Sequence, residues 1–170
     1  LSGETAMGKY PVEALKMMVE IVKQAESHLD YTSFRKRTVS EENSHNISNS
    51  VCYSSVSTAH DLGAKVIIAP TISGFTARML SKWRPETPVI GLSPSASSVR
   101  RMQLYWGVTA FQAKRAESTD LLIEASLELL KAKGYVSDGD IAIITAGVVI
   151  PSRRHKPATQ TNIMRVITID

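Results

Sequence analysis

Two short segments of the sequence carry residue types that suit phosphate binding. The first lies between a short apolar stretch and a predicted helix, and its residues are Thr71, Ile72, Ser73, Gly74, Phe75 and Thr76. Its hydroxyl groups offer hydrogen-bond donors, and its glycine lets the backbone approach a ligand closely. The N–H groups at a helix N-terminus add partial positive charge, which favours an anion. Helix capping by Ser or Thr is an equally good interpretation of these residues.

The second segment is a basic run at positions 152–157, before the last predicted strand. Its cationic residues are Arg153, Arg154 and Lys156, with His155 between them. Arginine binds phosphate in a bidentate manner and lysine adds a point charge, so this run could close over a phosphorylated ligand. A solvated surface loop is the alternative interpretation. We expect both segments at the carboxyl edge of one sheet, where two phosphates of one sugar could be held between them.

Other chemistry is not indicated by the sequence. There is no P-loop lysine motif after the first segment and no Gly-x-Ser-x-Gly nucleophile elbow. The four histidines and Cys52 show no metal-ligand spacing. Cys52 is interpreted as a packed small hydrophobe rather than a nucleophile. We therefore predict no catalytic residue and no metal site in this chain.

Composition limits the class of protein. The chain has 170 residues, 43% hydrophobic and 21% charged, which suits one domain or one domain with a piece of another. No apolar run approaches the roughly 18 residues of a membrane span, so no membrane partner is expected. The net charge of +4 is spread along the chain, so we predict no nucleic-acid partner; a basic nucleic-acid module is a minor alternative. A single cysteine suits a reducing compartment and predicts a cytoplasmic location.

The first residues of the chain are predicted to form one helix, over 10–28. Pro11 suits its first position. Its apolar face consists of Leu15, Met18, Val19 and Val22. Residues 2–8 are expected to be a loop, and residues 30–45 a polar linker or mobile surface segment. Because the chain starts at Leu1 rather than Met, we expect it to belong to something longer.

From residue 46 the sequence alternates between predicted helices and strands. Helices are expected at 46–62, 75–83, 95–102 and 118–133, and strands at 65–69, 88–92, 104–112, 141–145 and 162–169. This order predicts an α/β fold, a three-layer α/β/α sandwich with a five-stranded, mostly parallel sheet. The last strand follows a loop instead of a helix, so we expect it to run antiparallel to the strand before it.

The sequence resembles the pyruvate kinase family. Leu1-Ser-Gly-Glu-Thr-Ala-x-Gly-x-Tyr-Pro-x-Glu-Ala14 is similar to the segment at the end of that family's (β/α)8 catalytic barrel. Further motifs follow in the family's order: Thr71-x-Ser-Gly-x-Thr-Ala77, Arg84-Pro-x-x-Pro-Val-Ile90, Gly139-Asp140, Ile144-Thr-Ala-Gly147 and Thr161-Asn162. The resemblance implies that residues 1–28 are the last loop and helix of the barrel, and that 29–170 form the C-terminal effector-binding and oligomerisation domain.

The resemblance also implies an activity for the parent protein. Pyruvate kinases are phosphotransferases of glycolysis that convert phosphoenolpyruvate and ADP to pyruvate and ATP, with Mg²⁺ and K⁺. The family's metal-binding and catalytic residues lie earlier in the barrel and have no counterpart here, so the chain alone is expected to hold no cofactor and to be inactive. The implied partners are its own barrel domain and the other subunits of a homotetramer.

The family's C-terminal domain often binds an anionic effector, which the resemblance makes fructose 1,6-bisphosphate, AMP or a sugar monophosphate. One phosphate is implied at Thr71, Ser73, Gly74 and Thr76, with backbone N–H groups from Ile72 and Phe75. A second phosphate is implied at the loop 148–160, which contains Arg153, Arg154 and Lys156. The predicted function is therefore allosteric regulation, and the alternative is a purely structural assembly domain with a vestigial anion pocket.

Two departures from the family bear on that choice. Phe75 stands where many relatives carry a basic residue. The loop 148–160 is longer than in many bacterial relatives, and Val148 replaces the Trp of some relatives that bind a bisphosphate. Both departures bear on which effector binds rather than on the presence of an anion site, and the three cations of the loop could compensate for them.

Overall fold

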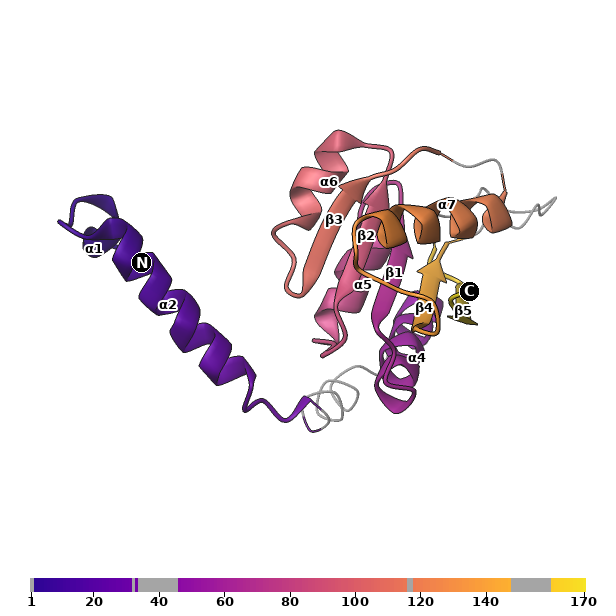
Figure 1. Cartoon of the computed structure of the whole chain (residues 1–170), viewed down its shortest axis with the longest axis horizontal. Helices are drawn as coiled ribbons and strands as arrows, with labels where there is room; N and C mark the ends of the chain where they lie inside the picture. The colour runs from indigo at the N-terminus through magenta and orange to yellow at the C-terminus, as the bar shows by residue number, and fades with distance from the viewer. Residues whose placement is uncertain (1, 32, 34–45, 116–117, 148–159) are drawn as a thin grey trace. The chain divides into compact units, whose positions relative to one another are not determined.

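The computed structural model describes residues 2–31, 33, 46–115, 118–147 and 160–170 (Figure 1). The chain divides into two compact units, Leu1–Phe34 and Arg35–Asp170. Most of the predicted linker at 30–45 lies outside the described residues. The domain boundary between residues 28 and 29 stays a prediction.

Among the described residues, unit 1 includes the helices α1 (Gly3–Ala6) and α2 (Pro11–Glu26). Helix α2 begins with Pro11 at its first turn, as predicted. The prediction of a loop at 2–8 is wrong in one respect, because these residues include the short helix α1. Two amides, those of Thr5 and Ala6, donate to the carbonyl of Ser2 and close this helical turn.

The predicted apolar face of α2 is largely exposed within unit 1. Leu15, Val19 and Val22 each keep more than two fifths of their surface accessible. A helix with an apolar stripe gains most of its stability by burying that stripe against another element. The sequence pattern thus identified the face, and unit 1 by itself does not bury it.

Unit 2 follows the predicted alternation of helices and strands. Its elements are α4 (Ile47–Asp61), β1 (Val66–Pro70), α5 (Phe75–Lys82), β2 (Val89–Ser93), α6 (Ala96–Met102), β3 (Val108–Gln112), α7 (Thr119–Ala132), β4 (Ile141–Ala146) and β5 (Ile163–Thr168). They form the predicted three-layer α/β/α sandwich. Helices α4, α5 and α6 cover one face of the sheet, and α7 covers the other (Figure 1).

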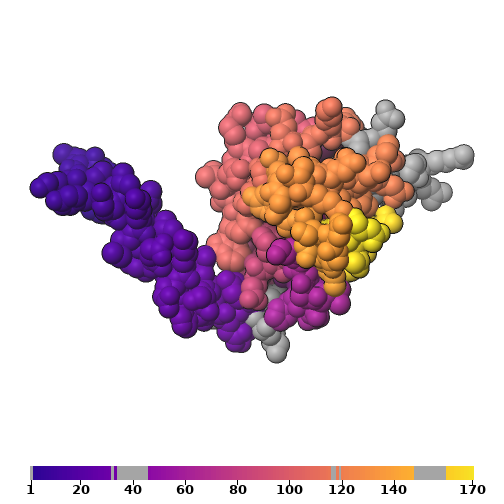
Figure 2. All heavy atoms as spheres, viewed as in Figure 1, coloured from indigo at the N-terminus to yellow at the C-terminus, as the bar shows by residue number. Residues whose placement is uncertain are grey.

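The sheet has the order β3-β2-β1-β4-β5. Strand β1 pairs in parallel with β2 and β4, and β2 pairs in parallel with β3. Strand β5 is antiparallel to β4, which confirms the prediction from the missing crossover helix. As an edge strand, β5 is mostly exposed, with Met164 and Val166 among its exposed side chains, and it reaches the surface in Figure 2 (yellow).

The third strand begins later than the sequence predicted. Tyr105 and Trp106, expected within it, lie in a turn before Val108, so this part of the prediction is wrong. Gly107 has a φ of 68°, which is incompatible with an extended strand. The carbonyl of Trp106 accepts a hydrogen bond from Ser81 Oγ at 2.7 Å and is therefore committed to α5.

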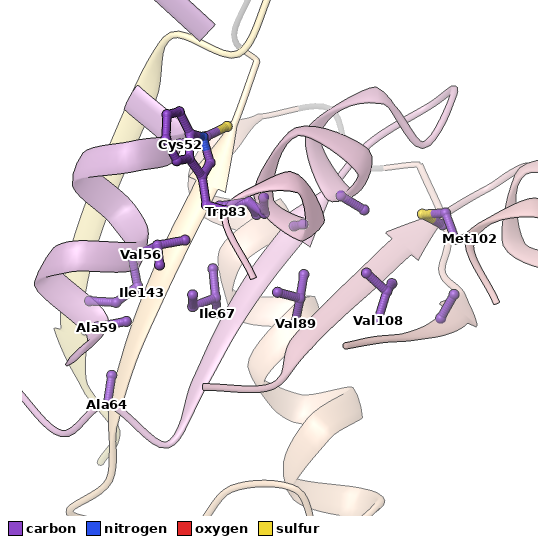
Figure 3. Close-up of a cluster of buried hydrophobic side chains, with 14 residues drawn as sticks. Cys52, Val56, Ala59, Ala64, Ile67, Trp83, Val89, Met102, Val108 and Ile143 are labelled. Carbon is purple, nitrogen blue, oxygen red and sulfur yellow. The ribbon is translucent and has the colours of Figure 1, made fainter. Parts of the chain in front are cut away.

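Successive side chains of β1 point to opposite faces of the sheet and therefore pack into two different cores. Ile67 and Ala69 belong to the core under α4, α5 and α6 (Figure 3). Val66 and Ile68 belong to the core under α7. A strand that is covered on both faces must be apolar at every position, which explains the continuous apolar run in the sequence.

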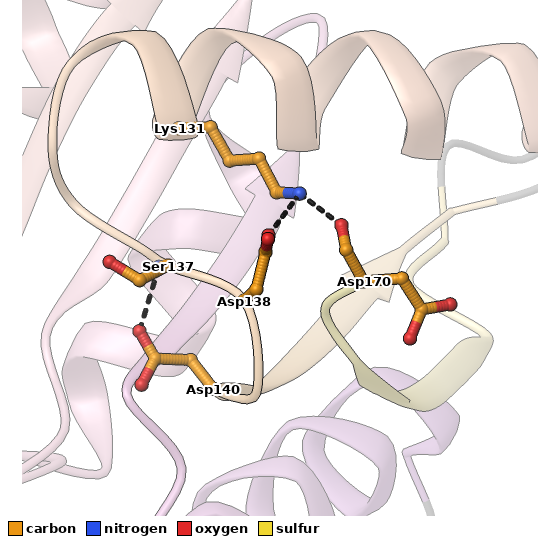
Figure 4. Close-up of polar contacts among 5 residues, drawn as sticks. All are labelled: Lys131, Ser137, Asp138, Asp140 and Asp170. Atoms are coloured by element: carbon orange, nitrogen blue, oxygen red, sulfur yellow. Dashed lines mark hydrogen bonds and ion pairs between the residues drawn. The ribbon is translucent and has the colours of Figure 1, made fainter.

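The C-terminal segment is held at the turn between α7 and β4 (Figure 4). Lys131 Nζ donates to Asp138 Oδ1 at 2.6 Å and also to the main-chain carbonyl of Asp170. The amide of Ser137 donates to Asp140 Oδ2 at 2.9 Å and closes the turn. The ion pair of Lys131 with Asp138 is exposed and contributes roughly 0–1 kcal/mol to stability.

Candidate anion-binding site

The segment 71–76 lies at the carboxyl end of β1, which is where ligands bind in parallel sheets. Its first amide, that of Thr71, donates to the carbonyl of Leu92 at 2.8 Å and continues the pairing of β1 with β2. The chain then turns away from the sheet and enters α5 at Gly74. The edge of the sheet therefore positions this segment, which is called the anion loop below.

Helix α5 begins at a glycine, so the capping interpretation of the loop hydroxyls is not supported. Gly74 has a φ of 83°, in the left-handed region, and α5 has no side-chain cap at its N-terminus. By contrast, three other described helices of unit 2 have side-chain caps; these are Asn46 for α4, Ser95 for α6 and Ser118 for α7. The first N–H groups of α5 therefore have no side-chain acceptor among the described residues, which favours an anion there.

The three loop hydroxyls lie in different environments. Thr71 Oγ1 accepts from the amide of Gly74 at 3.1 Å and closes the loop. Ser73 is exposed. Thr76 is 4% exposed, and its Oγ1 lies 2.9 Å from Thr161 Oγ1. The Ser73 hydroxyl can reach a ligand from solvent, whereas the Thr76 hydroxyl already has a buried partner.

Gly74 is required for packing as well as for its backbone conformation. A Cβ atom at this position would lie 3.0 Å from Cγ of Met102, which is fully buried. The left-handed φ adds strain for any residue with a side chain. These are reasons for a glycine that do not depend on a ligand.

Two neighbours of the anion loop are not singled out by the sequence pattern. Ser93, at the end of β2, donates a hydrogen bond from its Oγ to the carbonyl of Ile72 at 3.0 Å and so links the loop to the neighbouring strand. The guanidinium of Arg78 lies 5.8 Å from the centre of the Phe75 ring and brings a cation to the first turn of α5. The spacing of Phe75 and Arg78, three positions apart on one helix, is the signal that could have revealed this contact.

The remaining loop residues, Ile72 and Phe75, differ in exposure. Ile72 is 59% exposed, whereas Phe75 is half-buried. Neither side chain places a negative charge near the loop. Both are consistent with a loop that offers backbone N–H groups at these positions.

The second predicted phosphate segment lies outside the described residues, and this includes Arg153, Arg154 and Lys156. Both ends of its connection are described. The amide of Asn162 donates to the carbonyl of Ala146 at 3.0 Å, and Thr161 contacts Thr76 of the anion loop. The structure thus brings the C-terminal end of this connection to the first turn of α5.

Metal and nucleophilic chemistry find no support among the described residues. No group of three or more His, Cys, Asp or Glu side chains in this part of the chain is placed to hold a metal ion. Cys52 is fully buried in the core, as predicted, and burial raises its pKa to about 12. Its thiol is therefore protonated at neutral pH. No described helix is long and apolar enough to cross a membrane.

A three-layer α/β unit with a mostly parallel sheet belongs to the class of domains in which the carboxyl edge of the sheet is the usual place for a ligand. The family model "Pyruvate kinase, alpha/beta domain" matches residues 49–167, so the chain belongs to the pyruvate kinase family through this domain.

Relatives and solved structures agree with this assignment. The chain is 38% identical to a pyruvate kinase of Sporosarcina psychrophila over 99% of its own length and 28% of the relative's. It is 42% identical to a pyruvate kinase of Staphylococcus aureus over 87% of its length and 25% of the relative's. The crystal structure of a pyruvate kinase from Cryptosporidium parvum matches with a TM-score of 0.86 and 29% identity, over 100% of this chain and 32% of that one. The chain thus spans about a quarter to a third of the length of these proteins.

Proposed function

We propose that the chain is the C-terminal part of a pyruvate kinase and that unit 2 binds an anionic effector at the anion loop. The observation that carries this proposal is the N-terminus of α5, which follows a hydroxyl-rich loop and has no side-chain cap. An effector phosphate would accept hydrogen bonds from these N–H groups. The chemical class of the effector is a sugar phosphate or a nucleotide, such as fructose 1,6-bisphosphate or AMP.

The loop residues have distinct roles in this proposal. The exposed Ser73 hydroxyl donates to the phosphate, and Thr71 holds the loop closed through its bond to the Gly74 amide. Ile72 and Phe75 contribute N–H groups. Arg78, held beside the Phe75 ring, supplies positive charge at a position where the loop itself has none.

A second phosphate of the same effector is assigned to Arg153, Arg154 and Lys156. The contact of Thr161 with Thr76 supports this assignment, because it brings the end of the connection that carries these cations to the anion loop. A bisphosphate would then be held from two sides, and a monophosphate from one.

The activity of the whole protein follows from the family. The parent would transfer a phosphoryl group from phosphoenolpyruvate to ADP in the cytoplasm, with Mg²⁺ and K⁺ bound in its barrel. This chain alone would be inactive, because the family's metal-binding and catalytic residues lie earlier in the barrel, outside this sequence. It would contact its own barrel domain and assemble into a homotetramer. The exposed apolar side chains Met164 and Val166 on edge strand β5 support a subunit contact there.

Regulation requires that the effector bind one arrangement of the subunits more tightly than another. A difference in affinity of five- to 150-fold between two states corresponds to a coupling free energy of about 1–3 kcal/mol. An effector that bound both arrangements equally would shift nothing, however tightly it bound.

The experiment is a thermal-shift titration of the 170-residue chain with fructose 1,6-bisphosphate, AMP, ribose 5-phosphate and inorganic phosphate. A ligand at one hundred times its Kd adds about 2.7 kcal/mol of stability, which raises the Tm measurably. Ser73→Ala is the test variant, because this side chain is exposed and its loss should not disturb the fold. We expect one metabolite to raise the Tm of the unaltered chain and to do so less in the variant.

Two results would contradict the proposal. If none of the four anions shifted the Tm, unit 2 would be better described as a structural assembly domain with a vestigial pocket, for which Phe75 already gives some support. If an anion shifted the Tm of the variant and of the unaltered chain equally, the ligand would bind elsewhere on the molecule.

A further inference from the structure

The described residues of unit 2 include two buried pairs of hydroxyl groups, each formed between residues far apart in the sequence. In one pair, Thr76 Oγ1 and Thr161 Oγ1 are 2.9 Å apart. In the other, Thr145 Oγ1 donates to Ser55 Oγ at 2.8 Å. All four side chains are buried. Only the first pair includes a residue of the anion loop, so the two pairs allow a matched comparison.

Thr161 connects three elements through two hydrogen bonds. Its hydroxyl contacts Thr76, in the first turn of α5. Its backbone amide donates to Ser48 Oγ, in the first turn of α4, at 3.0 Å. Thr161 itself lies two residues before β5. The first turn of α5 is therefore tied to the beginning of α4 and of the edge strand through one buried residue.

The hydrogen atoms of the Thr76–Thr161 pair limit what Thr76 can do. Each threonine hydroxyl has one hydrogen to donate and two lone pairs that accept. If Thr76 donates its hydrogen to Thr161, it has none left for a ligand. If Thr161 donates to Thr76, the Thr76 hydrogen is free to point at an anion, and the two bonds strengthen each other.

We infer that Thr161 is a positioning residue of the anion loop: it holds the first turn of α5 in place and donates to Thr76, so that Thr76 can donate to a bound phosphate. Ser48 supports this role by accepting from the Thr161 amide. The inference rests on the proposed effector site and deepens it, because it adds a residue that touches the loop but not the ligand.

The test compares three variants of the full 170-residue chain. Thr161→Val removes the hydroxyl and keeps the shape of the side chain, whereas Thr161→Ser keeps the hydroxyl. Thr145→Val is the matched control, since it removes a buried threonine hydroxyl that does not contact the loop. The readouts are the Kd for fructose 1,6-bisphosphate, for AMP and for inorganic phosphate by calorimetry, and the amide hydrogen exchange of residues 72–78 without ligand.

For Thr161→Val we expect a Kd about tenfold weaker, because an interaction that polarises the ligand-binding hydroxyl is lost. Thr161→Ser and Thr145→Val should both stay within about twofold of the unaltered chain, because the Thr76 partner is retained in both. In the absence of ligand, exchange at 72–78 should be faster in Thr161→Val than in Thr145→Val, because local opening follows the loss of a local buried contact.

Several outcomes would overturn the inference. Equal Kd values for Thr161→Val and Thr145→Val would show that Thr161 does not act on the ligand, while the effector site itself would stand. Equal exchange at 72–78 in these two variants would show that Thr161 does not hold the loop, whether or not a ligand binds. If the unaltered chain bound none of the anions, the proposed function would fail, and so would the claim that Thr161 helps Thr76 to donate to a phosphate. The exchange data would then still decide whether Thr161 holds the first turn of α5 in place.

A second variant covers the case in which Thr161→Val does not fold. Ser48→Ala leaves both threonine hydroxyls in place and removes only the acceptor of the Thr161 amide. It should weaken the Kd by about threefold and speed exchange at 72–78, since Thr161 loses one of its two anchors. No change in either quantity would contradict the role of Thr161.

Discussion

Two neighbouring junctions at the same edge of the sheet, β1 to α5 and β2 to α6, are both rich in hydroxyl groups but use them differently. At the second junction, Ser95 Oγ accepts from the amide of Ser98 at 3.3 Å and caps α6. At the first, α5 begins at Gly74 and has no side-chain cap. The number of hydroxyl groups therefore does not show whether a helix is capped, whereas the contact that each hydroxyl makes does.

The difference between the junctions originates at the residue that begins each helix. Ser95 has extended backbone dihedrals, which direct its side chain over the first turn of α6. Gly74 is left-handed and has no side chain to offer. The first N–H groups of α5 thus have no side-chain acceptor at the helix start among the described residues. At the α6 junction, by contrast, the Ser95 hydroxyl accepts a hydrogen bond from one of the first N–H groups of that helix.

The largest effect is expected from Gly74→Ala. A side chain at this position adds left-handed strain and a contact with the buried Met102, so we expect a loss of about 2 kcal/mol in the free energy of unfolding, measured with urea. The matched control is Gly63→Ala, which has a φ of 59° but nothing within 4 Å of the added Cβ. The control should cost about 1 kcal/mol. Equal losses in both variants would mean that packing against Met102 does not restrict the anion loop.

Much of the fold was predictable because it depends on local patterns. The alternation of helices and strands from residue 46 predicted the three-layer α/β/α sandwich, and the lack of a helix before β5 predicted its antiparallel direction. The helix predicted at 118–133 corresponds to α7, which Ser118 caps. These features follow from residues that are close in sequence.

The candidate site was less predictable, because its details depend on residues far apart in sequence. Thr76 and Thr161 are 85 positions apart, so the burial of the Thr76 hydroxyl cannot be inferred from the loop alone. Helix capping by Ser or Thr was a reasonable expectation for α5. In the structure, however, the amide of Thr71 still pairs with Leu92 of the neighbouring strand, and the residue that begins α5 is Gly74 rather than a serine or threonine.

An intermediate effect is expected from removing the serine of each junction. Ser95→Ala should lower the free energy of unfolding by about 1 kcal/mol, because α6 loses its cap. Ser73→Ala should change it by less than about 0.5 kcal/mol, because that side chain is exposed and makes no cap. Urea denaturation of both variants measures the difference. If Ser73→Ala were as costly as Ser95→Ala, the Ser73 hydroxyl would have a structural role at the first junction, and the contrast between the junctions would disappear.

The smallest effect is expected from Arg78→Gln, which tests whether the cation beside Phe75 strengthens anion binding at the first junction. Removing this exposed charge should weaken the Kd for inorganic phosphate by about two- to fivefold at low salt, since exposed charge pairs contribute less than about 1 kcal/mol. The loss should shrink as salt approaches about 1 M, where the Debye length is about 3 Å. Arg100→Gln changes the net charge equally but lies in the last turn of α6, so it controls for the overall charge of the chain. Equal effects of the two variants would assign the attraction to net charge, and a loss that did not depend on salt would argue against a direct electrostatic contact with Arg78.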